Sequence, residues 1–273
     1  MLQYPGLRPL LMAALCWWGA AIAEPLPQFD AHVHYSEDAW HALTPAEAVD
    51  LFKEAGVRAA LVSSTPDDGT RKLLAADPQR VVPFLRPYRS GSDRPAWTTD
   101  PGVRAYVEAR LDDGTPYRGI GEFHLSLDDV RAPNVARFAD LAAARGLFFH
   151  AHVNSAAMAA LKDAYPRVRM LWAHAGLSEG PDAALELLDR YDGLWIELSL
   201  RDDVAPDGVL DPSWRQVFLK HPDRFLVGTD TWIPSRWDAL GPNAEFTRGW
   251  LGQLPPEVAQ KIAYRNGERL FLE

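Results

Sequence analysis

The sequence predicts an α/β protein with one domain, a distorted (β/α)8 TIM barrel that spans residues 24–273. Eight short apolar, strand-like runs alternate with stretches of helical periodicity. The runs recur at intervals of roughly 20 to 40 residues, which is typical of right-handed βαβ units with parallel strands. Eight such units in about 250 residues match a closed barrel. An open doubly wound sheet is the main alternative, but no Gly-rich phosphate loop follows the first run, which ends in His32-Val33-His34.

The expected elements follow one another in order along the chain. Strands are expected at 28–34, 57–63, 81–86, 118–124, 147–152, 168–174, 194–198 and 224–230. The first long helix is expected to begin at Pro45, because Thr44 can cap it and Glu47 completes the start signal. Further helices are expected at 134–144, 155–164, 181–188 and 214–220, with a closing helix at 260–271. No linker or low-complexity segment interrupts this alternation.

The first 23 residues have the pattern of a secretory signal peptide. Arg8 precedes a charge-free apolar stretch that closes on Ala21-Ile22-Ala23. The stretch is shorter than the roughly 20 apolar residues that a spanning helix needs, so cleavage after Ala23 is favoured over a stable membrane anchor. The sequence thus predicts a secreted or periplasmic protein. Cys16 is the only cysteine and would be lost, so any metal ion must be bound through nitrogen and oxygen.

The charge balance limits the partners. The chain has a formal net charge of −9 and no run of Lys or Arg. Nucleic acids and anionic membranes attract proteins through positive surfaces, so neither is expected as a partner. A small-molecule substrate is expected instead, and the sequence leaves a homo-oligomer open.

Reactive side chains gather at the ends of the expected strands, which meet at one mouth of a parallel barrel. Six of the eight histidines have this placement: His32, His34, His124, His150, His152 and His174. His32 and His34 are two residues apart, so they project from one face of a strand and can bind one ion together. A core histidine that is satisfied by backbone groups is a plausible alternative for one of the six, but a poor one for all of them.

Two carboxylates extend the pattern. Glu122 ends the fourth expected strand together with His124, and Asp230 ends the eighth. A buried carboxylate needs a cation, so Glu122 is expected to bind metal or to pair with an arginine of the barrel. Asp230 is expected to act as the general base beside a metal-activated water, with a helix N-cap as its alternative role.

Together these residues resemble the amidohydrolase superfamily. The resemblance rests on His32-x-His34, Glu122, His150, His174, Asp230 and the closing Asn266-Gly267-Glu268-Arg269-Leu270-Phe271, and covers the whole mature chain. It is greatest to the amidohydrolase-related branch that also contains metal-dependent decarboxylases, with some likeness to the TatD-type ligand set.

The resemblance implies a site for one or two divalent ions, zinc above all, with manganese as an alternative. His32, His34 and Asp230 would bind the more buried ion. His150 and His174 would bind a second ion, bridged by Glu122. Many relatives use a carboxylated lysine as the bridge, but none of the five lysines lies at an expected strand end.

The expected reaction is hydrolysis of a small-molecule amide, ester, lactone or phosphoester by a metal-activated water. Decarboxylation of a small aromatic or unsaturated acid is the main alternative; a TatD-like nuclease and a binding or metal-storage protein are further ones. Guanidinium groups of the loop after the third strand suit a substrate carboxylate or phosphate, or salt bridges that pin the loop. The candidate substrate contacts are His124, His152, Arg86, Arg89 and Trp232.

Overall fold

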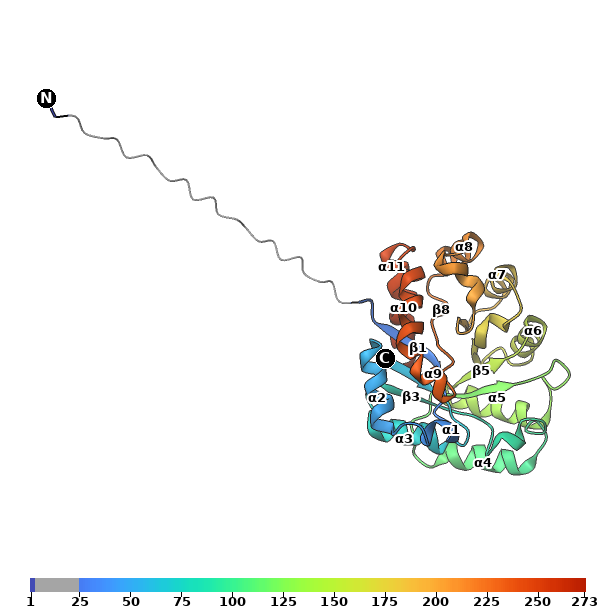
Figure 1. Cartoon of the computed structure of the whole chain (residues 1–273). Helices are drawn as coiled ribbons and strands as arrows, with labels where there is room; N and C mark the ends of the chain where they lie inside the picture. The colour runs from blue at the N-terminus through green and yellow to red at the C-terminus, as the bar shows by residue number, and fades with distance from the viewer. Residues whose placement is uncertain (3–24) are drawn as a thin grey trace.

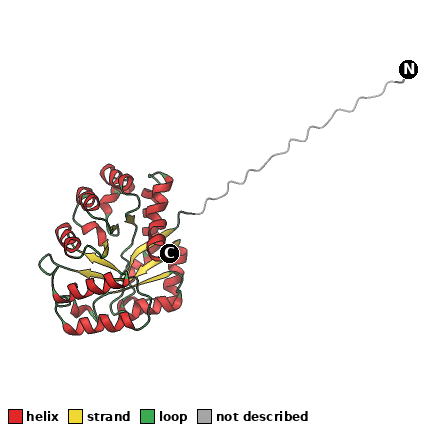
Figure 2. Ribbon diagram, turned by 180° about the vertical axis from the view of Figure 1, so that it is seen from behind, coloured by secondary structure: helices red, strands yellow, loops and turns green. Residues whose placement is uncertain are grey.

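Eight parallel strands form the centre of the molecule in a computed structural model that describes residues 1–2 and 25–273. They are β1 (Gln28–Val33), β2 (Val57–Val62), β3 (Val81–Leu85), β4 (Gly119–His124), β5 (Phe148–His152), β6 (Arg169–Trp172), β7 (Leu194–Glu197) and β8 (Phe225–Leu226). Each strand pairs with its neighbours in chain order. The strands lie inside a ring of helices (Figures 1 and 2). The predicted (β/α)8 barrel is thereby confirmed.

The helices lie between and after the strands. They are α1 (Glu37–Trp40), α2 (Pro45–Glu54), α3 (Asp68–Ala76), α4 (Pro101–Asp112), α5 (Pro133–Arg145), α6 (Ser155–Ala164), α7 (Pro181–Arg190), α8 (Pro212–Lys220), α9 (Pro234–Asp238), α10 (Leu240–Leu251), α11 (Pro256–Gln260) and α12 (Asn266–Phe271). Thr44 caps α2 with a complete capping box, as its sequence predicts. The predicted closing helix is α11 and α12, joined by one π-helical turn. Among the described residues, no helix has the length and apolar character that crossing a membrane requires.

The barrel closes between its first and last strands. β8 is only two residues long, and the chain beyond it continues along β1 without a regular ladder. Ala31 N donates to Val227 O at 2.9 Å, and His34 N donates to Thr231 O at 2.8 Å. The side chain of Asp30 adds to the seam by accepting hydrogen bonds from the amide and the hydroxyl of Thr229. In Figure 1, β1 and β8 accordingly lie side by side although they come from opposite ends of the chain.

An aromatic cluster fills one end of the barrel. Phe271 of α12 stacks on Phe29 with ring centroids 5.7 Å apart and meets Phe148 edge-on at 4.9 Å. Phe29 and Phe148 lie near the starts of β1 and β5, so the apolar plug occupies the end at which the strands begin. The polar groups described below occupy the other end, as the barrel architecture predicts.

Two predictions need adjustment. Strands six and eight end earlier than expected, so His174 lies in a short 3-10 turn (Ala173–Gly176) and Asp230 lies in the loop after β8. The predicted signal peptide falls almost wholly on residues 3–24, which lie outside the described residues.

Candidate metal centre

Strand β1 places two histidines side by side at the mouth. His32 and His34 are both buried, and their Nε2 atoms lie 3.1 Å apart. Nδ1 of His32 lies 2.9 Å from Oε2 of Glu197, and Nδ1 of His34 contacts the carbonyl oxygen of Ser63. In a neutral ring whose Nδ1 donates to oxygen, Nε2 has a free lone pair. Two such nitrogens about 3 Å apart suit neighbouring ligands of one ion.

Glu122 of β4 lies between these histidines and those of the neighbouring strands. Its Oε2 is 3.6 Å from His32 Nε2 and 3.4 Å from His34 Nε2, and its Oε1 is 3.5 Å from His174 Nε2. Arg86 donates to Oε2 at 2.8 Å from the remaining side. Glu122 therefore occupies a bridging place among three histidines, and it also forms the arginine ion pair that was its alternative role.

Irregularities in the pairing of β1 and β4 orient the metal-site side chains of these two strands. The pairing register shifts between Asp30 and Val33 against β2, and between Gly121 and Phe123 against β5. Each shift is a bulge, in which one strand has a residue more than its partner and the side chains turn. Gly121 has φ +130°, and a Cβ there would lie 2.1 Å from the carbonyl oxygen of His150, so only glycine fits beside the bulge.

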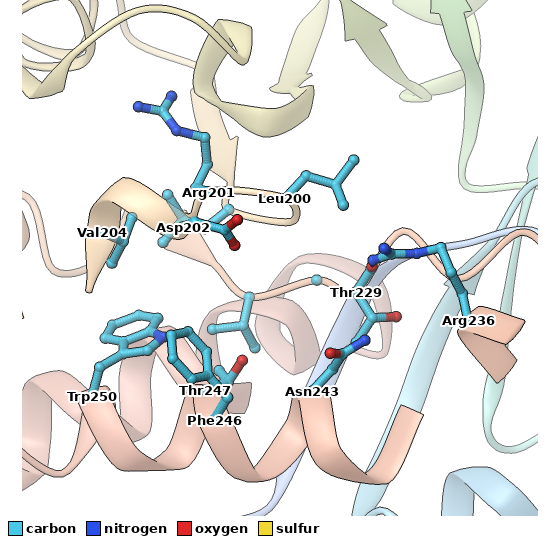
Figure 3. Close-up of a pocket in the computed structure, with 13 residues that line it drawn as sticks. Leu200, Arg201, Asp202, Val204, Thr229, Arg236, Asn243, Phe246, Thr247 and Trp250 are labelled. Atoms are coloured by element: carbon cyan, nitrogen blue, oxygen red, sulfur yellow. The ribbon is translucent and has the colours of Figure 1, made fainter. Parts of the chain in front are cut away.

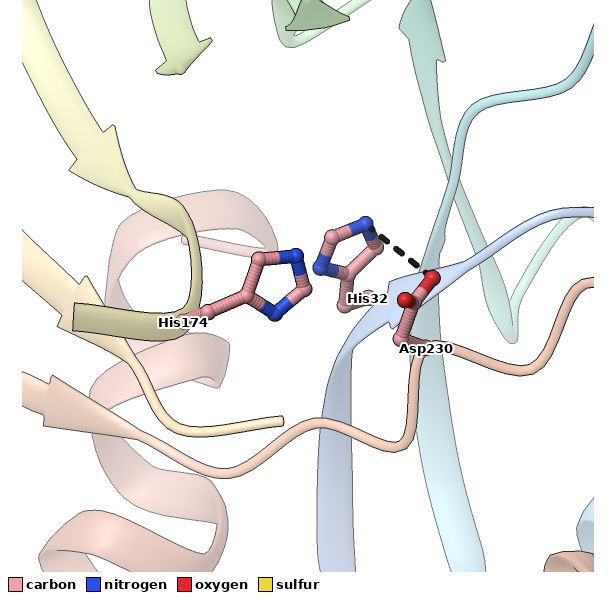
Figure 4. Close-up of side chains that lie close together, drawn as sticks. All are labelled: His32, His174 and Asp230. Atoms are coloured by element: carbon pink, nitrogen blue, oxygen red, sulfur yellow. Dashed lines mark ion pairs between the residues drawn. The ribbon is translucent and has the colours of Figure 1, made fainter. Parts of the chain in front are cut away.

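Asp230 approaches from the loop after β8. Its Oδ1 lies 3.3 Å from His34 Nε2 and 3.6 Å from His32 Nε2, and Figure 4 shows it facing His32. The next helix, α9, begins at Pro234 with Ile233 at its N-cap position, so Asp230 does not cap it. The geometry supports the expected ligand and base role over the capping role.

His174 reaches the centre from the opposite side (Figure 4). Its ring stacks on that of His32 at 4.8 Å, and its Nδ1 lies 2.8 Å from Oγ of Ser199. That contact leaves Nε2 facing Glu122. His32, His174 and Asp230 form one group whose ligand atoms lie within 4.8 Å of one another.

His150 of β5 is fully buried, with its ring 4.5 Å from that of His32. Among the described residues, neither of its ring nitrogens has a hydrogen-bond partner. The structure groups it with His32 and Glu197, and it has no polar contact with Glu122 or His174, the other two residues of the expected second site. An imidazole buried with both nitrogens unsatisfied is unfavourable, and a bound cation would remove that cost.

The centre is strongly polarised. Burial alone disfavours a charged His32, but Asp230, Glu197 and Glu122 raise its pKa well above the usual value. Burial likewise opposes ionisation of the carboxylates, but His32 and the histidines beside it together outweigh burial, so the pKa of Glu122 lies well below its usual range and that of Glu197 falls to about 2. The pKa of Asp230 is also lowered, because His32 and His34 outweigh its burial. Burial lowers the pKa of His150 far below 6.5, so its ring is neutral, as a ligand must be.

The charges fit a divalent cation. Glu122, Glu197 and Asp230 contribute −3 and Arg86 contributes +1, so these four side chains sum to −2 when the histidines are neutral. One divalent ion balances that charge and can replace the proton on His32. Nitrogen and carboxylate oxygen are the donors that the sequence predicts for a metal site.

Outside the centre, the mouth opens into a cavity of about 250 Å³. Its lining includes His124, His152, Arg86, Arg94 and Trp232, beside Glu122 and Asp230. His124 and His152 stack at 4.3 Å, and His152 Nδ1 lies 2.8 Å from Oε1 of Glu122. Burial lowers the pKa of His124 to about 3, so its ring is neutral. A second hollow of about 550 Å³ shares His124, His152 and Arg94 with the first.

The arginines of the loop after β3 differ in their surroundings. Arg86 is buried and donates to the carboxylate and the carbonyl of Glu122. The expectation that Arg89 contacts substrate is corrected, because its guanidinium is bound by Asp93 and Asp100 and it does not line the mouth. Arg94 lines both hollows, and no ion pair to it is found within the described residues.

Three residues of the site escaped the sequence analysis. Glu197 is buried on β7 against His32, Ser199 holds His174, and Asp30 lies beneath His32. Burial, partly offset by hydrogen bonds from Thr229 and His32, raises the pKa of Asp30 to about 6. The one signal for Glu197 in the sequence is that it is the only acidic residue in the apolar run 194–198.

Comparison with known proteins agrees with this geometry. A family model described as amidohydrolase matches residues 17–272. No curated protein matches the chain.

Solved structures share the fold at low sequence identity. A protein from Acinetobacter baumannii, described as a probable 2-pyrone-4,6-dicarboxylic acid hydrolase with citric acid bound, is 12% identical, with a TM-score of 0.58 over 91% of this chain and 100% of its own. An amidohydrolase from Burkholderia multivorans with bound zinc is 15% identical, with a TM-score of 0.56 over 90% of this chain and 99% of its own. A TatD-family hydrolase from Entamoeba histolytica is 10% identical, with a TM-score of 0.55 over 91% and 99%.

Proposed function

The chain belongs to the amidohydrolase family and is a metal-dependent hydrolase, and we propose that it cleaves an amide, ester, lactone or phosphoester bond of a small molecule. The observation that carries the proposal is the centre itself, in which buried histidines and three ionised carboxylates meet at the mouth of the barrel. That arrangement has the charge and the donors for a divalent ion, and one face of it opens on a cavity.

We propose zinc as the ion, with His32, His34 and Asp230 as ligands of a first ion. Imidazole nitrogens outnumber carboxylate oxygens around the centre, which favours zinc over magnesium or calcium; manganese is the alternative. A second ion would be bound by His174 with Glu122 as the bridge, while His150 lies beside His32 and Glu197.

A bound divalent ion lowers the pKa of water and polarises the bond to be cleaved. The residues of the chain have the remaining roles. Asp230 is ionised, so its carboxylate can accept the proton of the attacking water and return it to the leaving group. Glu197 and Ser199 fix the orientation of His32 and His174. Arg86 donates to Glu122 and holds its carboxylate in place.

The mouth suggests how substrate is bound. Arg94 has its charge available to a carboxylate or phosphate of the substrate. Trp232 is 46% exposed at the same cavity and offers a face for a planar group, while the rings of His124 and His152 offer hydrogen bonds. Nothing at the site favours decarboxylation over hydrolysis.

The proposed location is outside the cytoplasm, because the first 23 residues have the pattern of a signal peptide. Mass spectrometry of the protein from its native host should find a mature chain that begins at Glu24. The acidic chain is proposed to act on small molecules without a nucleic-acid partner.

Two measurements test the function together. Metal analysis of the purified protein should find one or two divalent ions per chain, and a chain without affinity for zinc or manganese would refute the mechanism. A screen of esters, lactones, amides, phosphoesters and carboxylic acids, with carbon dioxide monitored, should find hydrolysis. Release of carbon dioxide without hydrolysis would replace hydrolase by decarboxylase.

A further inference from the structure

Two residues of the centre have an unusual backbone conformation. His174 has φ 56° and Asp230 has φ 46°, both in the left-handed region that residues with a side chain rarely adopt. Neither residue belongs to a strand, so no ladder of hydrogen bonds holds its backbone. Such a conformation persists only where the surrounding structure fixes it.

An arginine binds the carbonyl oxygen of each of these residues. Arg236 of α9 donates from Nε to Asp230 O at 2.7 Å, and from Nη2 to Thr229 O. Arg201 donates from Nη1 to His174 O and to Ala175 O, both at 3.0 Å. Each guanidinium therefore binds two consecutive carbonyls of one loop, Arg236 through two nitrogens of its planar fork and Arg201 through Nη1 alone.

Both arginines are themselves held in place. Arg201 is buried, pairs with Asp203 through Nε and Nη2 at 2.7 and 2.6 Å, and lies 4.8 Å from the ring of Trp214. Arg236 extends from a helix that begins four residues after Asp230, so it folds back on its own loop. Figure 3 shows the two arginines at the border of one cavity of about 310 Å³, which lies between the loop after β7 and helix α10.

We propose that Arg201 and Arg236 are positioning residues that hold the backbone of His174 and Asp230 so that imidazole and carboxylate face the same ion. The proposal rests on the proposed metal-dependent function. Ser199 orients the ring of His174, whereas the arginines fix the backbone position of each ligand residue. Neither guanidinium lines the cavity at the mouth, and both contact the loops of His174 and Asp230 through backbone carbonyls.

The test is the affinity of the folded protein for zinc, measured by competition with a chromophoric chelator. Arg236→Gln keeps a polar side chain but loses the two-carbonyl contact, and zinc affinity should fall about 10- to 100-fold, as is typical when a group behind a ligand is lost. Arg248→Gln is the matched control, because Arg248 also binds two carbonyls, those of Leu26 and Ala55, next to the starts of β1 and β2. It should lower thermal stability and leave zinc affinity unchanged.

Chemical rescue adds a second arm. Arg236→Ala leaves a vacancy beside the cavity, so guanidinium chloride at low millimolar concentration should restore part of the zinc affinity of this variant and have no effect on Arg248→Ala. Circular dichroism verifies that each variant folds; if Arg236→Gln does not, Arg236→Lys, which keeps the charge without the fork, takes its place.

The results of these measurements distinguish the positioning role of the arginines from the proposed function. Wild-type zinc affinity in folded Arg236→Gln or Arg236→Lys, or equal losses in the Arg236 and Arg248 variants, would overturn the positioning role while the proposed function stands. A wild-type protein that binds no zinc or manganese would refute the proposed function itself.

Discussion

Replacement of Glu197 by glutamine tests the interpretation of the centre most directly, because sequence analysis did not identify this residue. Glu197 is fully buried, and its two oxygens accept from different donors: Oε2 from His32 Nδ1 at 2.9 Å, and Oε1 from the amide of Ser199. A glutamine has one oxygen and one NH2 group, so one of the two donors would face another donor. An unsatisfied buried donor costs about 1–3 kcal/mol.

With the NH2 group in the place of Oε2, that cost falls on His32, whose ring must present Nε2 to the ion. We therefore expect Glu197→Gln to weaken zinc binding about 10- to 100-fold, which corresponds to about 1.4–2.7 kcal/mol, and to lower turnover with it. The assay is chelator competition at pH 7.5, with the change in thermal stability of the zinc-free chain recorded in parallel. Glu47→Gln, which removes an exposed carboxylate from the capping box of α2, is the control. Zinc affinity within twofold of wild type would show that Glu197 does not orient His32.

The remaining predictions concern other parts of the molecule. His174→Ala should abolish turnover and leave the circular dichroism spectrum intact; retained turnover would remove His174 from the centre. Dialysis against a strong chelator should abolish activity, and added zinc should restore it; activity that survives complete metal removal would contradict the mechanism. Gly228→Ala should weaken zinc binding, because its Cβ would lie 2.3 Å from Oε1 of Glu197; unchanged affinity would mean that the loop moves freely. Burial raises the pKa of Asp67, which accepts from Tyr117, to about 6, so the folded chain prefers the protonated form. The free energy of unfolding of the wild type should therefore fall, relative to that of Asp67→Asn, as the pH rises from 4 to 6. Above pH 6 the difference should be constant at about 3 kcal/mol. A difference between the two proteins that does not change with pH, measured by urea denaturation, would refute this.

The barrel was predictable because its signals are local. The capping box at Thr44 and the alternation of apolar runs with helices can be read within a few residues, and most predicted strands end within one residue of the observed ones. The two clear differences, at His174 and Asp230, occur where the chain leaves the ladder for a left-handed turn. That conformation depends on Arg201 and Arg236, which are far along the chain or on the next helix, and no local pattern shows such contacts.

The sequence identified most residues of the site, but it did not show which of them contact one another. Histidines at strand ends converge because parallel strands share one mouth, so the topology brings His32 and His34 to the same end of the barrel as His174. Glu197 was missed because a carboxylate in an apolar run is informative only when its partner, 165 residues away, is known. Arg89 was misplaced because two aspartates of its own loop and the following segment, Asp93 and Asp100, bind it. Sequence spacing does not indicate which of several neighbouring arginines remains unpaired.

An ion bound at the seam between β1 and the segment after β8 would also stabilise the closed barrel. His32 and His34 lie in and directly after the first strand, and Asp230 lies in the loop after the last strand, so one ion bound by all three would link the two ends of the folded chain. Opening the seam would then require release of the ion, so local fraying of the short β8 would be suppressed in the loaded protein. At an ion concentration of 100 times Kd, binding adds about 2.7 kcal/mol to the free energy of unfolding. Asp230 is synthesised about 200 residues after His32 and His34, so the complete set of three ligands exists only when most of the chain has been made.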